Sequence, residues 1–307
     1  MIYSHTLGRL MKEEKYQGFI RVKPGEVICL KDCPTGWAQT EALKSVGKEK
    51  SKLHAEMRLE QDLAELAKVQ QLLYVDDRYS VLIVFQAMDA AGKDSTIKHV
   101  MSGVNPQGCQ VFSFKQPSNE ELNHNFLWRY MKKVPERGHI GIFNRSYYED
   151  VLIAKVHPEL LQKLADDRKD QIFWDARYQD INAFEQHLAR NGTVILKFFL
   201  HVSKKVQKKR FIERLDRPEK NWKFSMADLA ERERWDDYMK AYEQAINSTN
   251  TECAPWHIIP ADDKWAMRAA VADIITTRLH NLSLSYPTLT ETQITLLATA
   301  RKQLENE

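Results

Sequence analysis

The chain has 307 residues, which is enough for a sizeable core and one or two domains. Its 43% hydrophobic and 28% charged residues are typical of a globular protein, and a net charge of +3 is too small to indicate a nucleic-acid binder. No apolar run approaches the roughly 18–20 residues of a membrane span, and the first residues lack the apolar stretch of a secretory signal. The lack of such runs predicts no membrane association. The four cysteines show no zinc-site spacing, so we expect unpaired thiols in the reducing cytoplasm.

The remaining sequence alternates between helical patterns and short apolar runs. Residues 1–50 form an irregular extension, and residues 51–73 have apolar side chains at helical spacing. Short apolar runs predict strands at 79–87, 109–114, 139–144, 193–202 and 256–261. Helices are expected between them, at about 92–101, 119–132, 159–189 and 262–282. This order predicts one α/β domain over residues 51–285 with a parallel sheet covered on both faces.

The segment FQAMDAAGKDSTIKHV, residues 85–100, has the position of a phosphate-binding loop, after a strand and before a helix. It departs from the usual G-x-x-x-x-G-K-[ST] pattern at Ala87 and Asp94. Even so, the small run Ala90, Ala91 and Gly92 allows a phosphate close to the backbone, and Lys93 lies at a positive helix end. The alternative is a chance match at an ordinary turn.

Asp89 is unusual inside such a loop because a carboxylate repels phosphates. Mg²⁺, which is bound by one or two carboxylates together with substrate phosphates, would explain it. The alternative is a turn-forming aspartate that points to solvent.

The segment GIFNRSYYEDV, residues 141–151, contains the second group of polar residues. Asn144 and Arg145 follow a predicted strand, and ligands of open α/β sheets bind at the carboxyl ends of strands. Arg145 can clamp a phosphate, and Glu149 or Asp150 can hold Mg²⁺ through water. The alternative is an ion pair between Arg145 and Glu149.

Residues 204–223 contain nine basic and three acidic side chains, a local charge of +6. Such a run is often a solvated helix face, but here it suits a long polyanion, over which it would close as a lid. The basic residues expected to bind phosphate groups are Lys204, Lys205, Lys208, Lys209, Arg210 and Arg214.

With these segments, the sequence resembles the polyphosphate kinase 2 family. The loop AMDAAGKDSTI is similar to that family's G-x-D-x-x-G-K-x-x-x-I, and four further segments match it in order: 105–122, 143–151, 217–238 and 254–265. The resemblance implies a P-loop kinase-like three-layer α/β/α fold with a five-stranded parallel sheet and a helical lid at about 204–235. It covers residues 15–285, and the segment 286–307 is expected to be a C-terminal helix.

The resemblance also implies roles for individual residues. Asp89, Lys93 and Arg145 would be catalytic, with Asp89 and Glu149 as metal ligands. The loop residues Ala90 to Asp94 would bind phosphate, and the nucleotide would contact Lys115, Asn144, Arg145, Glu149 and Asp228. Asn144 departs from the family, because many members have a metal-binding aspartate at this position. The FNRS-x-YEDV form resembles the subgroup that accepts both mono- and diphosphates.

The expected function is therefore phosphoryl transfer between inorganic polyphosphate and AMP or ADP, reversibly and with Mg²⁺ or Mn²⁺. Adenine nucleotides are the expected substrates, with guanine nucleotides as a further candidate. Two alternatives are an ATP-dependent nucleotide kinase and a non-catalytic polyanion binder. A homo-oligomer, dimer or tetramer, is expected. The apolar residues of the C-terminal segment would form a subunit contact or pack on the chain's own domain: Leu289, Ile294, Leu297 and Leu304.

Overall fold

The computed structural model describes residues 21–38, 41–161 and 170–307. Five parallel strands form one sheet in the order β2-β3-β1-β4-β5. Their bounds are β1 Ser80–Gln86, β2 Cys109–Ser113, β3 Ile140–Asn144, β4 Thr193–His201 and β5 Trp256–Pro260. The predicted strands and the α/β class are thus confirmed.

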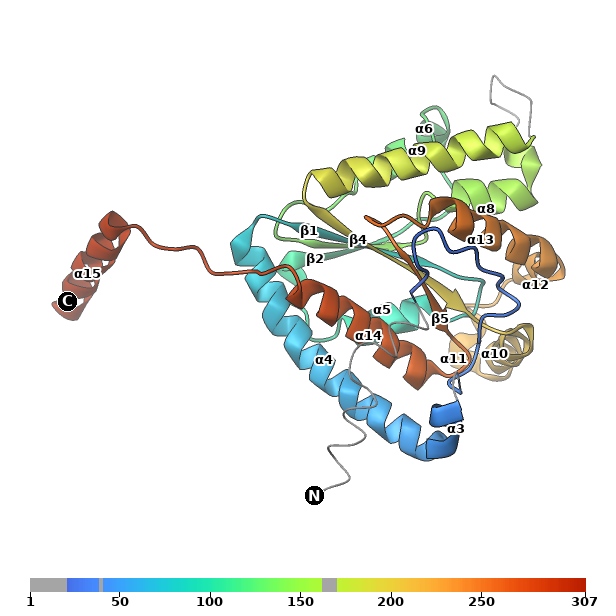
Figure 1. Ribbon diagram of the computed structural model, residues 1–307, viewed down its shortest axis with the longest axis horizontal. Helices are drawn as coiled ribbons and strands as arrows, with labels where there is room; N and C mark the ends of the chain where they lie inside the picture. Colours follow the sequence, from blue (N-terminus) through green and yellow to red (C-terminus); the bar gives the residue numbers. More distant parts are fainter. Residues whose placement is uncertain (1–20, 39–40, 162–169) are drawn as a thin grey trace.

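Helices cover both faces of the sheet and make three layers (Figure 1). One layer contains α4 (Lys48–Asp76), α5 (Lys93–Val100) and α14 (Lys264–His280). The other contains α8 (Glu149–Val156), α9 (Gln171–Arg190) and α13 (Trp235–Thr249). Strands β1 and β4 are buried along their whole length, which explains why both appear in the sequence as continuous apolar runs.

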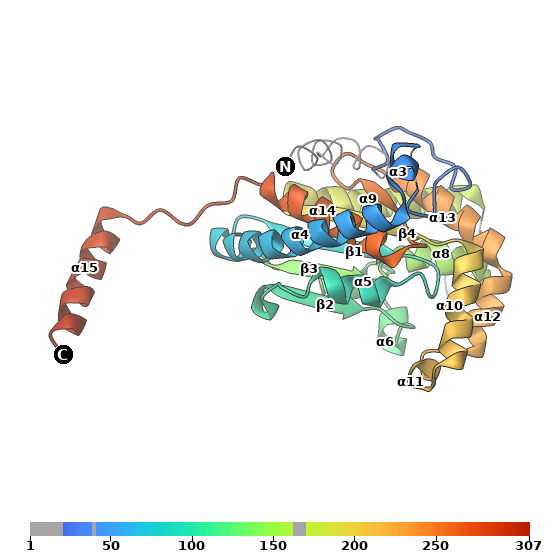
Figure 2. The same ribbon diagram turned by 90° about the horizontal axis from the view of Figure 1, so that it is seen from below.

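The basic segment forms a helical projection at the carboxyl ends of the strands (Figure 2). It consists of α10 (Lys204–Asp216), α11 (Pro218–Asn221) and α12 (Met226–Glu233), which leads into α13. Pro218 at the start of α11 separates it from α10. This is the segment predicted as a lid, and we call α10 to α12 the lid segment.

Two predicted helices differ from the structure. The helix expected at 119–132 is interrupted into α6 (Asn119–Leu122) and α7 (Trp128–Met131). Between them the side chain of Asn125 accepts a hydrogen bond from the amide of Leu127 at 3.1 Å, a local turn that competes with helix. The helix expected at 159–189 is observed only from Gln171, because Asp170 caps the N-terminus of α9. The short η2 (Pro158–Leu161) lies before it in the chain. Residues 162–169 of the expected helix lie outside the described residues. Helix α8 was not predicted.

The described part of the N-terminal extension lies against the domain. After residues 21–38 comes the short α3 (Glu41–Val46), followed by α4. The amide of Val22 donates to the carbonyl of Trp256 on β5 at 3.0 Å. The amide of Leu30 donates to Glu243 of α13 at 2.7 Å, and both Val22 and Leu30 are buried. Residues 21–38 therefore run along β5 and α13 as part of the core's cover.

The C-terminal segment is helical as predicted, from Glu291 to Glu305 (α15), and Thr290 caps it. An extended stretch after α14 carries it away from the domain (Figures 1 and 2). Its apolar side chains are exposed, so packing on the chain's own domain is not observed: Leu289, Ile294, Leu297 and Leu304. The short η1 (Pro106–Gly108) completes the described elements. None of the helices within these residues is long and apolar enough to cross a bilayer.

Candidate active site

The loop between β1 and α5 has a backbone suited to binding an anion. Gly92 has φ of 111°, and Ala90 adopts φ of 60°, a left-handed conformation that costs energy for a residue with a Cβ. Within the described residues, the amides of Gly92, Lys93 and Asp94 donate no hydrogen bond. Free N–H groups at the N-terminus of α5 favour a negatively charged ligand. The loop thus has the geometry of a phosphate-binding loop despite its two departures from the pattern.

Lys93 lies inside this loop. Its ammonium donates to the carbonyl of Ala87 at 2.7 Å. Burial lowers the pKa of Lys93, and the nearby positive charge of Arg145 lowers it further. The opposing carboxylate charges of Asp89, Glu149 and Asp94 are smaller influences on this pKa. An anion in the loop would therefore relieve an unfavourable positive charge.

Asp89 and Arg145 meet above the loop. The guanidinium of Arg145 donates to the Asp89 carboxylate at 3.0 Å, and its other nitrogen lies 4.0 Å from Glu149. Burial acts to lower the pKa of Arg145, but the carboxylates of Glu149 and Asp89 outweigh it and raise this pKa above its ordinary value. The ion pair with Glu149 considered from the sequence is present, but the closer partner is Asp89. Both side chains of this pair remain about one-third exposed.

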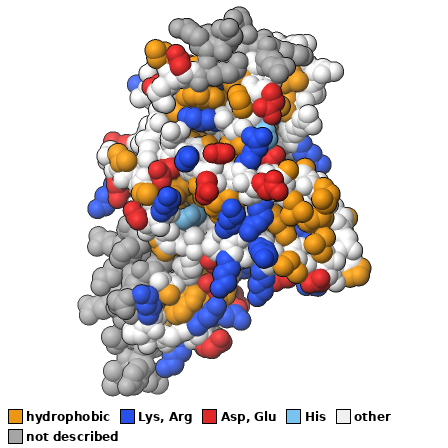
Figure 3. Space-filling model, turned by 90° about the vertical axis from the view of Figure 1, so that its right-hand side faces the viewer, with side chains coloured by type: hydrophobic (Ala, Val, Ile, Leu, Met, Phe, Trp, Pro, Cys, Tyr) orange, Lys and Arg blue, Asp and Glu red, His pale blue; other side chains and the backbone are white. Residues whose placement is uncertain are grey.

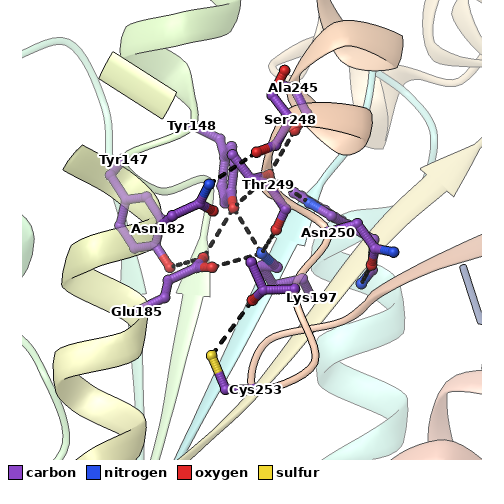
Figure 4. A network of polar contacts seen from close by, with 12 residues as sticks. Tyr147, Tyr148, Asn182, Glu185, Lys197, Ala245, Ser248, Thr249, Asn250 and Cys253 are labelled. Carbon is purple, nitrogen blue, oxygen red and sulfur yellow. Dashed lines mark hydrogen bonds and ion pairs between the residues drawn. The ribbon is translucent and has the colours of Figure 1, made fainter. Parts of the chain in front are cut away.

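Arg145 is also in a left-handed conformation, with φ of 66°, directly after β3. A buried network follows it (Figure 4). The hydroxyls of Tyr147 and Tyr148 donate to Glu185 at 2.7 and 2.9 Å, and Lys197 donates to Glu185 at 2.6 Å. Burial and the Glu185 charge raise the pKa of both tyrosines, so the hydroxyls stay protonated. This network fixes the turn that presents Arg145.

Two further predicted residues lie near this centre. Burial raises the pKa of Glu149, while Arg145 and Lys93 lower it less. Burial also raises the pKa of Asp228, and the negative charge of Asp89 raises it further, which places Asp228 on the side of the lid segment that faces the loop. Arg214 donates to Asp228 at 3.2 Å, so these two predicted residues pair with each other.

Asn144 lies at the end of β3, as predicted, and its amide donates to Asp94 at 2.7 Å and to Ser113 at 3.3 Å. It therefore connects the ends of β2 and β3 to the start of α5. Lys115 is exposed just beyond β2 and forms no hydrogen bond or ion pair with this group within the described part of the chain.

Arg210 does not lie in the open site, contrary to the role predicted for it in polyphosphate binding. It is 8% exposed, and its guanidinium donates to the carbonyls of Ala90 (3.0 Å) and Ala91 (2.7 Å) and also to Ala261 (2.7 Å). Its hydrogen-bonding capacity is used to hold the loop's backbone. In contrast to Arg210, the lysines of α10 that were predicted to bind phosphate groups are exposed: Lys204, Lys205, Lys208 and Lys209.

Sequence reasoning missed Gln207, which is buried and donates to the carbonyl of Asp89 at 2.9 Å. Arg232 of α12 in turn donates to the side chain of Gln207 at 2.7 Å. Ser203, Gln207 and Arg210 recur at helical spacing, and this stripe within a basic run was the available signal. The lid segment is thereby hydrogen-bonded to the loop.

On the face at the carboxyl ends of the strands, Lys and Arg side chains gather in a band beside a hydrophobic area (Figure 3). The described residues contain no group of three or more His, Cys, Asp or Glu side chains arranged to hold a metal ion. The carboxylates of the site are instead those of Asp89 and Glu149, on either side of Arg145. All four cysteines are unpaired, as expected.

Comparison with known proteins agrees with this geometry. The family model described as polyphosphate kinase 2 (PPK2) matches residues 49–286. An ADP-polyphosphate phosphotransferase of Rhodopseudomonas palustris is 54% identical over 83% of this chain and 89% of its own length. An AMP/ADP-polyphosphate phosphotransferase of Meiothermus ruber is 49% identical over 72% of this chain and 80% of its own.

Among solved structures, a polyphosphate kinase 2 from Arthrobacter aurescens superposes with a TM-score of 0.79 at 38% identity. The match covers 93% of this chain and 97% of that one. The observed sheet, the position of the loop and the lid segment are thus those of a P-loop kinase-like fold. The chain belongs to the polyphosphate kinase 2 family.

Proposed function

We propose that this protein transfers the terminal phosphoryl group of inorganic polyphosphate to AMP or ADP. The observation that carries the proposal is the loop itself, where free amides at Gly92 to Asp94, the half-buried Lys93 and Arg145 converge on one place. The names of the relatives support the substrates, since they act on polyphosphate with ADP or with AMP and ADP.

In the proposed reaction, a phosphate oxygen of the acceptor attacks the terminal phosphorus of polyphosphate in line. A new P–O bond to the nucleotide forms while the bridging P–O bond breaks, and the shortened chain leaves with the bond's electron pair. The transition state is loose and its charge lies on the peripheral oxygens, so positioning and charge stabilisation dominate. Lys93, Arg145 and the loop amides supply that stabilisation. The attacking oxygen is already ionised, so a strong general base is unnecessary.

The residues present fit a magnesium ion, with Mn²⁺ as a substitute. Mg²⁺ is commonly bound by one or two carboxylates together with substrate phosphates and water. Asp89 has one carboxylate oxygen on Arg145 and is 30% exposed, and Glu149 lies on the other side of the same guanidinium. These two would hold the ion, which would offset the repulsion between donor and acceptor phosphates.

The finer assignments are part of the same proposal. Asn144, Lys115 and Asp228 would contact the acceptor nucleotide, and its base would be adenine, with guanine as a second candidate. The acceptor range includes both AMP and ADP, as for the relative from Meiothermus ruber. We propose a cytoplasmic homo-oligomer, a dimer or tetramer, in which the four unpaired thiols remain reduced.

The donor distinguishes this function from that of an ordinary nucleotide kinase. Purified protein would be incubated with Mg²⁺ and AMP or ADP, with either long-chain polyphosphate or ATP as donor, and the nucleotides separated by chromatography. The proposal predicts ADP and ATP from polyphosphate. Phosphorylation of AMP by ATP alone, without reaction of polyphosphate, would support the nucleotide kinase instead.

A further inference from the structure

The side chain of Gln86 is buried without hydrogen-bond partners at the base of the candidate active site. Gln86 is the last residue of β1, directly before the phosphate-binding loop, and it is fully buried. Within the residues that the structure describes, neither the oxygen nor the nitrogen of its side-chain amide makes a hydrogen bond. Buried polar groups are nearly always bonded, so an amide with both atoms unbonded calls for an explanation.

The strand register shows which face of the sheet this amide occupies. Gln86 is paired with Phe199 of β4, and the ring of Phe199 packs on Tyr242 of α13 with centroids 4.5 Å apart. Paired residues of adjacent strands point to the same face, so Gln86 points to the layer of α8, α9 and α13. Burial raises the pKa of Tyr242, and the charges of Glu149 and Asp89 raise it further, so its hydroxyl stays protonated near both carboxylates.

Glu149, the first residue of α8, is the group on which the Gln86 amide acts. Burial raises the pKa of the Glu149 carboxyl, and the charge of Arg145 is the largest influence that lowers it. The Gln86 amide lowers this pKa as well, as a hydrogen-bond donor at close range. The two side chains nevertheless do not meet at hydrogen-bond geometry. A small movement of either side chain would therefore complete the bond.

Other polar groups buried on the same face of the sheet are bonded. Ser80, at the start of β1, donates to Thr193 at 3.0 Å. Lys197, two residues before Phe199 on β4, donates three hydrogen bonds of 2.6 to 2.9 Å to buried partners. Among these three polar positions of the face, the unbonded one is the one that borders the candidate site.

We propose that Gln86 is a positioning residue for Glu149, and that its amide N–H holds one carboxylate oxygen of Glu149 when the acceptor and the ion are bound. The inference rests on the proposed function, in which Glu149 holds the ion and contacts the nucleotide, and it deepens that function. The other carboxylate oxygen then faces the site in a fixed orientation. In the free protein the amide stays unbonded, so an apolar residue of the same shape would be at least as favourable for folding.

Gln86→Met separates this role from a structural one, because methionine has a similar shape but no amide. The unfolding midpoint of the free protein should stay the same or rise by about 1–3 °C, since two unbonded polar atoms are removed. The rise in midpoint that Mg²⁺ and ADP produce together, without a donor, should shrink by about half or more. With polyphosphate and ADP, kcat should fall about tenfold or more, while the KM for polyphosphate changes less than about twofold.

Gln70→Met is the matched control. Gln70 of α4 is also buried, but its side-chain oxygen accepts a hydrogen bond from the amide of Asn105 at 3.3 Å. This contact lies next to η1, at the amino end of β2. The control should lower the midpoint of the free protein, and it should leave kcat and the response to Mg²⁺ and ADP unchanged.

A further pair of variants tests whether Gln86 acts through Glu149. Glu149→Gln should itself lower kcat, and Q86M/E149Q should be no less active than Glu149→Gln, because the amide then has no carboxylate to orient. Losses of kcat that multiply in the double variant would overturn the proposal. A full loss in Gln86→Met beside an unaffected Glu149→Gln would overturn it too.

The midpoints decide the matter independently of turnover. If Gln86→Met lowers the midpoint of the free protein as Gln70→Met does, and responds to Mg²⁺ and ADP like wild type, Gln86 is structural and the inference is wrong. If wild type forms no phosphorylated product from polyphosphate with AMP or ADP, the proposed function fails. The response of the midpoint to Mg²⁺ and ADP then still shows whether Gln86 positions Glu149.

Discussion

The guanidinium of Arg145 lies 3.0 Å from the carboxylate of Asp89, although the two residues are 56 positions apart in the chain. The parallel order of β3 next to β1 brings them together, because both follow the carboxyl ends of adjacent strands. The contact joins the side chain proposed to clamp phosphate to the carboxylate proposed to hold Mg²⁺. Disturbing either partner should therefore affect catalysis more than folding.

We predict that Arg145→Lys lowers kcat/KM about 10²-fold or more, because an ammonium keeps the charge but loses the planar pair of donors. The unfolding midpoint should change little, since the side chain is 37% exposed. Steady-state kinetics with polyphosphate and ADP measures kcat/KM, and thermal unfolding measures the midpoint. Arg137→Lys, at an exposed arginine, is the control, and equal losses in both variants would refute the role of Arg145.

The buried pair of Lys197 and Glu185 gives a prediction on stability. Lys197→Met should destabilise the protein by about 3–5 kcal/mol, because Glu185 then remains buried without its cation. The double variant K197M/E185L should recover most of this loss, since it removes both charges. Urea unfolding measures both. A single variant as stable as wild type would show that the network does not depend on the charge.

Asp62 of α4 predicts a dependence of stability on pH. Burial raises the pKa of Asp62 to about 7 from 3.8, although Arg58 opposes this. Because the folded state holds the proton more tightly, the stabilisation is complete below pH 4 and is lost as the pH rises through about 7. The two pKa values correspond to at most about 4 kcal/mol. Asp62→Asn lacks this contribution. The unfolding free energy of the variant, relative to that of wild type, should therefore increase as the pH rises from 5 to 8. A difference in unfolding free energy between the two proteins that does not change with pH would contradict the prediction.

Ending the chain after Thr288 removes α15, in which none of the residues is buried. We expect the unfolding free energy to change by less than about 0.5 kcal/mol and the turnover to stay the same. Light scattering of the two forms tests the proposed subunit contact, because a smaller assembly would appear if the exposed leucines hold subunits together. A large loss of stability without change of mass would show that α15 packs on its own domain.

The sequence predicted all five strands to within about two residues, because buried parallel strands are continuous apolar runs. It also placed Asp89, Lys93 and Arg145 at one edge of the sheet, since strand–loop–helix order determines which residues meet there. The interruption at Asn125 was missed because a side chain competing for backbone hydrogen bonds leaves no periodic signal.

Tertiary contacts account for the other differences. Lys197 lies within the apolar run TVILKFFLHV, and its partner Glu185 on α9 is recognised only in the fold. Arg210 and its neighbours in the basic run have the same sequence character, yet Arg210 is buried against backbone carbonyls while Lys209 is exposed. Charge alone therefore could not separate residues that hold the loop from those available to a substrate.

The most direct test of the central claim is the turnover of Asp89→Asn. Wild type, this variant and the control Asp236→Asn, at an exposed aspartate of α13, would be assayed with Mg²⁺, long-chain polyphosphate and AMP, with ADP and ATP followed over time. We predict ATP from wild type and the control, and a loss of about 10²-fold or more in Asp89→Asn at an unchanged unfolding midpoint. A variant as active as wild type, or the absence of phosphorylated product from wild type with either AMP or ADP, would contradict the account.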